Sequence, residues 1–338
     1  MMSELLQETP SVLNVVLFLL AGVALLGVVL GFVTYAIYFE RKVIGWMQLR
    51  IGPNRVGPLG LLQTVADVAK LLLKEDTRPK HADKVLFALA PVLAYAPSFA
   101  VLAVIPFTDT LHFADLGIGV LYYMAVSGIT VIGVIMGGWA SNNKYSLIGG
   151  LRSAAQMISY EVPLVMSVVG VILMTGSMNL IDIVEGQRDV WNIVPQFIAF
   201  LVFIIAAQAE LNRTPFDLPE AESELVAGYH VEYSGFRFAM FMLAEYVYMF
   251  GMGSLITILF LGGWLPIHPA LGFIPGIVWF ILKFSLYVFF QFWLRATMPR
   301  LRVDQLMSFA WKGLLPVALL NILLTAVFIS VQNGTLGQ

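Results

Sequence analysis

Eight apolar segments, separated by more polar ones, divide the chain. The hydrophobic pattern predicts helices over residues 12–37, 84–106, 117–139, 156–178, 192–209, 238–263, 274–294 and 312–331. Most of these segments approach or exceed the roughly 20 apolar residues that a helix needs to cross a bilayer. The longer polar stretches between them are 40–83, 140–155, 210–237 and 295–311. We therefore predict an all-α polytopic membrane protein with eight transmembrane helices, forming a single membrane domain over residues 1–338.

The composition agrees with a membrane protein. Hydrophobic residues make up 59% of the chain and charged residues 12%, whereas soluble domains are roughly 25% charged. A transmembrane barrel would need short segments of alternating polarity, which the sequence lacks. The chain has no cysteine, so it can supply no disulfide and no thiolate ligand for zinc or an iron–sulfur cluster. Its acidic N-terminus does not resemble a cleaved signal, so we expect the first apolar segment to remain as a membrane span.

The distribution of lysine and arginine predicts the orientation. Seventeen of the 19 basic residues lie in or beside the four polar stretches that follow odd-numbered spans. Only Arg188 lies on the opposite side, and Lys283 lies within a span. Because basic loops stay in the cytoplasm, we predict that the four long loops are cytoplasmic and that both termini are on the outer, periplasmic side.

The first long loop contains a predicted amphipathic helix. Its beginning is rich in Gly-Pro turns, and the stretch 61–76 then has the spacing of a helix. Gln63, Asp67, Lys70 and Lys74 would share one face. This helix is too short and too charged to span the bilayer. Two interpretations remain open: a solvated surface helix, or an interfacial helix that covers a site at the membrane surface and turns Asp67 inward.

Three glutamates lie within or at the end of predicted spans. Glu161, Glu210 and Glu245 are on the fourth, fifth and sixth spans at similar depth. An ionisable group inside the bilayer is costly and normally faces a partner or a hydrated cavity. One interpretation is static pairing with Arg152 or Arg213, and the other is a route for protons. The similar depth of the three carboxyl groups favours the proton route.

The loop between the fifth and sixth spans is unusually acidic. Its carboxylates are Asp217, Glu220, Glu222, Glu224 and Glu232. Pro215 and Pro219 prevent the preceding helix from continuing. Asp217 and Glu220 have the spacing of a capping pair, which predicts a short helix that ends near Gly228. The loop could be simply solvated, but the aromatic residues around it favour packing against the protein.

Sequence motifs for cofactors or catalysis are absent. There is no phosphate-binding glycine loop and no pair of histidines at metal-ligand spacing. The four histidines, His81, His112, His230 and His268, are scattered in loops, and we expect them at the surface rather than at a metal site. The residues therefore predict no metal site and no complete catalytic site in this chain.

Five long motifs resemble one family over nearly the whole chain. They are E-R-K-x-x-G-x-M-Q-x-R-x-G-P-N-R-V-G (40–57), A-D-x-x-K-L-L-x-K-E-D (66–76), G-W-x-S-N-N-K-Y-S-L-I-G-G-L-R-x-x-A-Q-x-I-S-Y-E (138–161), E-x-N-R-T-P-F-D-L-P-E-A-E-S-E-L-V-x-G-Y-H-V-E-Y (210–233) and R-A-x-x-P-R-x-R-x-D-Q-L-M (295–307). In these motifs the chain is similar to the H-subunit family of proton-pumping NADH-quinone oxidoreductase, respiratory complex I.

The resemblance implies a function and a set of residues. The protein would form much of a quinone access chamber and a carboxylate channel that couples quinone reduction to proton pumping. Glu40, Arg41, Arg50, Asp67, Phe236 and Arg295 are the implied chamber residues. The implied channel residues are Glu161, Glu210, Arg213, Asp217, Glu220, Glu222, Glu224, Glu232 and Glu245.

The same resemblance implies partners and a location. Peripheral quinone-site subunits and antiporter-like membrane subunits would surround the chain. Other subunits would bind NADH, FMN and the iron–sulfur clusters, so the chain would be part of an oxidoreductase without holding its active site alone. The membrane would be the bacterial cytoplasmic (inner) membrane, with an organellar inner membrane as the alternative. Three other functions remain open: the homologous membrane subunit of a proton-pumping hydrogenase-type complex, a stand-alone cation/proton transporter, and a purely structural anchor for a peripheral enzyme.

Overall fold

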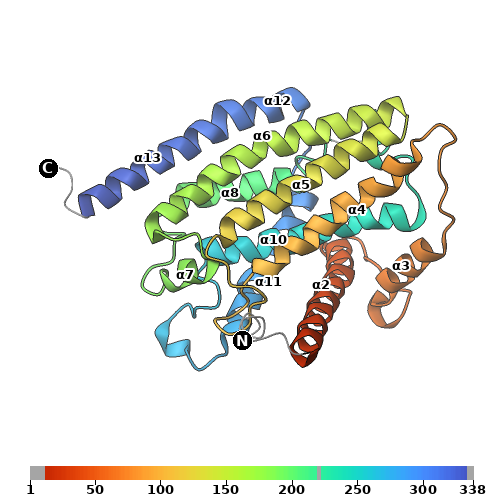
Figure 1. Cartoon of the computed structure of the whole chain (residues 1–338). Coiled ribbons are helices and arrows are strands. Elements are labelled where there is room, and N and C mark those ends of the chain that lie inside the picture. Colours follow the sequence, from red (N-terminus) through yellow and green to blue (C-terminus); the bar gives the residue numbers. More distant parts are fainter. Residues whose placement is uncertain (1–11, 219–221, 333–338) are drawn as a thin grey trace.

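The computed structural model describes residues 12–218 and 222–332, and this part of the chain contains helices and no β-strand (Figure 1). The long helices are α2 (Val12–Met47), α4 (Lys84–Ala100), α5 (Gly119–Ala140), α6 (Lys144–Thr175), α8 (Phe197–Glu210), α10 (Gly235–Phe260), α11 (Gly276–Thr297) and α13 (Leu315–Gln332). The shorter helices are η1 (Pro58–Gly60), α3 (Gln63–Leu73), η2 (Val101–Val104), α7 (Leu180–Glu185), α9 (Glu222–Leu225), η3 (Gly228–His230), η4 (Pro269–Leu271), α12 (Val303–Ser308) and the π-helix η5 (Phe309–Leu314).

Seven helices in the described part of the chain are long and apolar enough to cross a membrane. They are α2, α4 continued by η2, α5, α6, α10, α11 and the continuous α12–η5–α13 segment. The chain is thus an integral membrane protein. Helix α8 is apolar but has only 14 residues, because the predicted fifth span begins in turns before Phe197. The count of eight spans and the orientation of the termini stay predictions.

Two helices extend well beyond the apolar segments that predicted them. Helix α2 continues to Met47, since nothing between residues 38 and 45 breaks a helix. Helix α6 begins at Lys144, where the side chain of Asn143 accepts a hydrogen bond from the Tyr145 amide. Consequently, residues expected in polar loops lie on helices that also cross the apolar layer.

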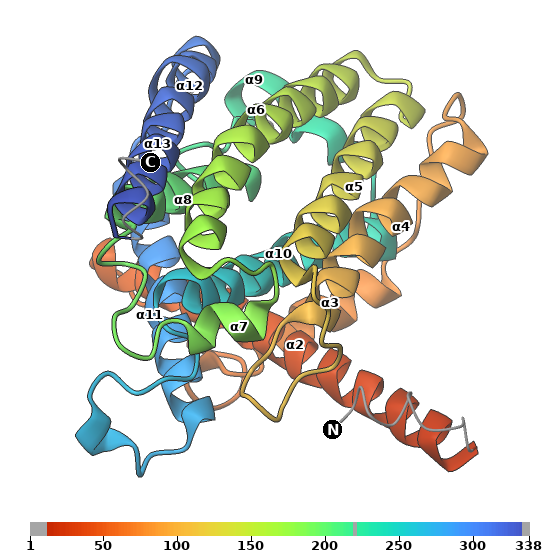
Figure 2. The same cartoon turned by 60° about the vertical axis from the view of Figure 1, so that its left-hand side comes forward.

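Helix α10 forms the centre of the molecule. Every residue from Val247 to Phe260 is buried, as expected for a helix that is apolar around its whole circumference. On one side, α4, α5, α6 and α13 lie side by side in that order in both views (Figures 1 and 2). Helices α2 and α11 pack against α10 and against each other. Residues on α10 can therefore contact both groups of helices.

Small residues allow the close packing of α4 and α5. A Cβ atom at Gly133 would lie 2.6 Å from the backbone nitrogen of Ala94, so only glycine fits at this crossing. Gly137, one turn later, lies against Phe241 of α10. The two glycines, four positions apart on α5, therefore serve helix packing.

Candidate functional site

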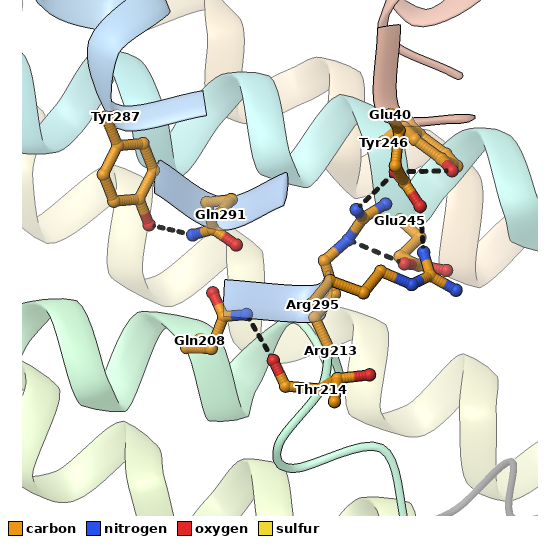
Figure 3. Close-up of polar contacts among 9 residues, drawn as sticks. All are labelled: Glu40, Gln208, Arg213, Thr214, Glu245, Tyr246, Tyr287, Gln291 and Arg295. Carbon is orange, nitrogen blue, oxygen red and sulfur yellow. Dashed lines mark hydrogen bonds and ion pairs between the residues drawn. The ribbon is translucent and has the colours of Figure 1, made fainter. Parts of the chain in front are cut away.

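A cluster of largely buried charged side chains joins α2, α10, α11 and the loop after α8. Glu40 of α2 is only 5% exposed. One oxygen of its carboxylate accepts hydrogen bonds from Arg213 Nη1 at 2.9 Å and from the Tyr246 hydroxyl at 3.0 Å. The other accepts a hydrogen bond from Arg295 of α11 (Figure 3). The Glu40 carboxylate thus has three hydrogen-bond donors.

Arg213 joins Glu40 to a second carboxylate. Its Nε lies 2.9 Å from Glu245 Oε1, and its guanidinium stacks over the Tyr246 ring at 4.4 Å from the centroid. The side chain is 2% exposed. Burial works to lower the pKa of Arg213, but the carboxylates of Glu245 and Glu40 outweigh it and hold that pKa well above its ordinary value. Arg213 therefore stays a cation between the two acids.

Three polar contacts fix the loop that carries Arg213. After α8, Asn212 adopts a left-handed conformation with φ 51°. Gln156 of α6 donates to the carbonyl oxygens of Ala209 and Phe216, both at 2.8 Å. Gln208 donates to the Thr214 carbonyl at 2.8 Å (Figure 3). These amide contacts hold the loop, and with it the guanidinium, in place. Gln156 belongs to the 138–161 motif but was not among the predicted site residues, and Gln208 lies outside the motifs.

Asp217 extends the charged cluster toward the segment after α11. It pairs with Arg300 at 2.9 Å. Burial raises the pKa of Asp217, and the nearby Arg300 guanidinium opposes this rise. One oxygen, Oδ1, is buried without a hydrogen-bond partner among the described residues. Arg300, like Tyr246, was not among the predicted site residues, although it belongs to the 295–307 motif.

A cavity of about 50 Å³ lies next to this cluster, between α5 and α10. Glu210 and Glu245 both line it, together with Thr130 and Tyr248. Its volume is several times the roughly 10–15 Å³ that one water molecule requires. Glu210 Oε2 is buried and has no hydrogen-bond partner among the described residues. The cavity can therefore hold a few waters in contact with two carboxyl groups.

Glu161 lies close to this cavity but does not line it. Its carboxylate faces Gly128 of α5, where an added Cβ would lie 3.1 Å from Oε1. It also interacts electrostatically with Glu210. Within residues 12–218 and 222–332, neither Glu161 nor Glu210 forms an ion pair. Static pairing with arginine is thus found for Glu245 alone among the three membrane glutamates.

The two remaining loop acids whose side chains the structure describes, Glu224 and Glu232, do not line the cavity. Glu224 pairs with Arg152 at 2.7 Å, with 55% of its side chain exposed. Glu232 accepts a hydrogen bond from Asn143 Nδ2 at 2.6 Å. Glu220 and the side chain of Glu222 lie outside the described residues. Of the predicted capping pair, Asp217 and Glu220, the structure describes only Asp217, which pairs with Arg300.

The residues implied for the quinone chamber separate into two groups. Glu40 and Arg295 are in the buried cluster, whereas Arg41 pairs with Asp67 of α3 at 2.6 Å. Asp67 therefore turns toward α2, and Gln63 also donates to it at 3.3 Å. Arg50 and Phe236 are exposed, Phe236 by 50%. In the first group Glu40 is buried while the Arg295 side chain is 36% exposed, and the second group is available to a ligand or a neighbour.

The prediction that all four histidines lie at the surface is wrong for His230. It is 7% exposed and packs edge-on against Phe238, with ring centroids 5.3 Å apart. Burial lowers the pKa of His230 to about 4. The loop position suggested exposure, but Ser146 of α6 binds the neighbouring Tyr229 carbonyl and draws this segment inward.

Comparison with known proteins identifies the family. A family model described as NADH dehydrogenase matches residues 20–326. The chain belongs to the NADH dehydrogenase family. It is 85% identical to the H subunit of NADH-quinone oxidoreductase from Brevibacillus brevis, over 99% of both chains. It is also 71% identical to the H subunit from Anoxybacillus flavithermus and 68% identical to that from Geobacillus kaustophilus, each over 97% of this chain and 98% of the relative. Members of the NADH dehydrogenase family with these names are subunits of a multisubunit oxidoreductase.

Proposed function

We propose that this chain is the H subunit of a proton-translocating NADH-quinone oxidoreductase. In this proposal it forms much of the quinone access chamber and a carboxylate channel that couples quinone reduction to proton pumping. The family membership and the near full-length similarity to subunits of that name support the assignment. The homologous hydrogenase-type and stand-alone transporter functions gain no comparable support.

One observation carries the coupling part of the proposal. Arg213 contacts Glu40, a residue implied for the quinone chamber, and also Glu245, which lines the cavity of the carboxylate channel. Two unit charges 4 Å apart interact by about 4 kcal/mol at an effective dielectric constant near 20. A change of charge on the chamber side would therefore alter the balance of charge at Glu245.

The proposed sequence of events follows from this arrangement. Quinone reduction next to Glu40 and Arg295 would place negative charge on the quinone. That charge would attract the nearby guanidinium groups toward the quinone. Arg213 or Arg295 would then interact less strongly with Glu40 and Glu245. A carboxylate that loses its cation binds a proton more readily, so Glu245 would take up a proton from the cavity waters. Glu210 and Glu161 would pass the proton toward neighbouring subunits.

The partners and location follow from the same assignment. Peripheral subunits would carry NADH, FMN and the iron–sulfur clusters, which agrees with a chain that has no cysteine to ligate a cluster. Antiporter-like subunits would lie on the Glu161 side. We place the complex in the bacterial cytoplasmic membrane, with cytoplasmic loops 40–83, 140–155, 210–237 and 295–311 and both termini on the outer side.

Substitution of Glu210 tests the channel. In the purified complex reconstituted into liposomes, Glu210→Gln should lower quinone-linked proton pumping about a hundredfold, the lower end of the effect of a positioned proton-transfer group. NADH oxidation by an artificial acceptor at the peripheral subunits should be unchanged. Glu185→Gln, at the surface ion pair with Arg188, is the matched control. Normal pumping by assembled Glu210→Gln complex would contradict the proposal.

A further inference from the structure

The cavity between α5 and α10 contains a pair of hydroxyl groups that the proposed channel has not used. Thr130 of α5 and Tyr248 of α10 are hydrogen-bonded to each other, and either oxygen could be the donor. Both side chains are buried, with 7% and 8% exposure. Their hydrogen bond connects positions 118 residues apart in the sequence.

The hydroxyl pair lies in the same cavity as two carboxyl groups. Thr130, Tyr248, Glu210 and Glu245 all line it. Tyr248 follows Glu245 by three residues on α10, so the two side chains are on one face of the helix. Tyr248 also interacts electrostatically with Glu210. The hydroxyl pair therefore faces the same cavity as the carboxyl groups of α8 and α10.

Buried polar atoms beside the pair have unused hydrogen-bonding capacity. Among the described residues, Glu210 Oε2 and the Tyr123 hydroxyl are buried without a partner. The Tyr123 hydroxyl fits only because residue 251 is glycine, where a Cβ would lie 2.8 Å from it. Buried polar groups are nearly always hydrogen-bonded to protein or to ordered water. Of these two groups Glu210 lines the cavity, so its unpaired oxygen suits the end of a short chain of waters there.

We propose that Thr130 and Tyr248 form a hydroxyl relay that carries protons between Glu245 and Glu210. This inference rests on the proposed function and assigns it two further residues. In each transfer, one hydroxyl oxygen gains a proton from a cavity water while its own proton leaves for the next oxygen. One O–H bond forms as another breaks, so no net charge stays on either residue. The hydrogen bond between the hydroxyls reverses its direction, since either oxygen can be the donor.

Isosteric removal of each hydroxyl tests the relay. We would measure protons pumped per NADH oxidised, and quinone-linked turnover, in liposomes containing the complete complex. Tyr248→Phe and Thr130→Val should each lower both quantities about a hundredfold or more. Thr130→Ser, which retains a hydroxyl, should remain near wild type. Because the two hydroxyls act as one unit, the double variant should be no worse than either single variant.

Matched controls separate a relay from local packing. Tyr122→Phe and Thr257→Val remove hydroxyls that donate only to backbone carbonyls of Ala100 and Gly253, and both should pump normally. Normal pumping by Tyr248→Phe and Thr130→Val would overturn the relay. Equal losses in Thr130→Ser and Thr130→Val, or additive losses in the double variant, would also overturn it by indicating a packing defect.

Glu210→Gln distinguishes failure of the relay from failure of the channel. If Glu210→Gln stops pumping while both relay variants pump normally, the relay is wrong and the carboxylate channel stands. If Glu210→Gln itself pumps normally, the proposed channel fails and the relay fails with it.

Discussion

Arg213 binds two carboxylates with different nitrogens of one guanidinium group, and Glu40 receives a second cation from Arg295. The negative charges of two carboxylates are therefore balanced by the positive charges of two guanidinium groups within this cluster. Removing one partner of a buried ion pair typically costs about 3–5 kcal/mol, because the other charge remains without compensation. The residues of this cluster are consequently poor targets for testing mechanism, whereas Glu210, which has no ion pair among the described residues, is a better one.

His230 makes the loop before α10 sensitive to acid. Its folded-state pKa of about 4 lies below the ordinary value of 6.5, so the unfolded loop binds a proton more readily. The stability that this group contributes is present above pH 6.5 and is lost as pH falls toward 4. We expect the stability of His230→Gln to depend less on pH between 6.5 and 4 than that of the wild type. Thermal inactivation rates of the purified complex at pH 5.0 and 7.5 measure the difference, and an unchanged ratio of rates would refute it.

At the scale of elements, α3 is attached to α2 by a partly exposed ion pair. Arg41 and Asp67 have side-chain exposures of 46% and 29%, and such pairs contribute about 0–1 kcal/mol. Because both residues are implied for the quinone chamber, their effect on activity should exceed their effect on stability. The pair therefore allows the function of α3 to be tested without unfolding the helix.

Asp67→Asn should slow quinone reduction more than it slows NADH oxidation by an artificial acceptor. The substitution keeps the size of the side chain but removes the charge that orients Arg41. Asp76→Asn is the matched control, since Asp76 pairs with Arg237 at 3.2 Å with similar exposure and follows the same helix. Both activities should be normal in the control. Equal loss of both activities in Asp67→Asn would indicate an assembly defect and contradict the chamber assignment.

The apolar segments were sufficient to predict a helical membrane protein, because spanning segments must satisfy their backbone polar groups within the bilayer, but not the ends of α2, α6 and α8. They were not sufficient for the ion cluster either. Glu40 was expected in a loop, yet it is buried by Arg213 and Arg295, which are 173 and 255 residues away in the sequence. Gln156 likewise has partners 53 and 60 residues away. Contacts of this kind depend on how helices pack, and no local pattern encodes them.

At the scale of the whole molecule, the ion cluster joins four segments that are distant in sequence. Glu40 comes from α2, Arg213 from the loop after α8, Glu245 from α10 and Arg295 from α11. Glu40 and Arg295 lie in the later parts of α2 and α11, and Glu245 lies in the first half of α10, so the cluster is nearer the side of the long polar loops. The basic residues of the long loops predict that this side is cytoplasmic.

The absence of cysteine allows this orientation to be measured directly. Lys80 precedes α4 and Asp189 follows α7, and both are exposed. In intact cells, a membrane-impermeant maleimide should label Asp189→Cys and spare Lys80→Cys. In inverted membrane vesicles the labelling should be reversed, because the cytoplasmic face then points outward. Labelling after detergent solubilisation provides the reference for total accessibility. Labelling of Lys80→Cys in intact cells, with Asp189→Cys spared, would reverse the topology and place the ion cluster on the outer side.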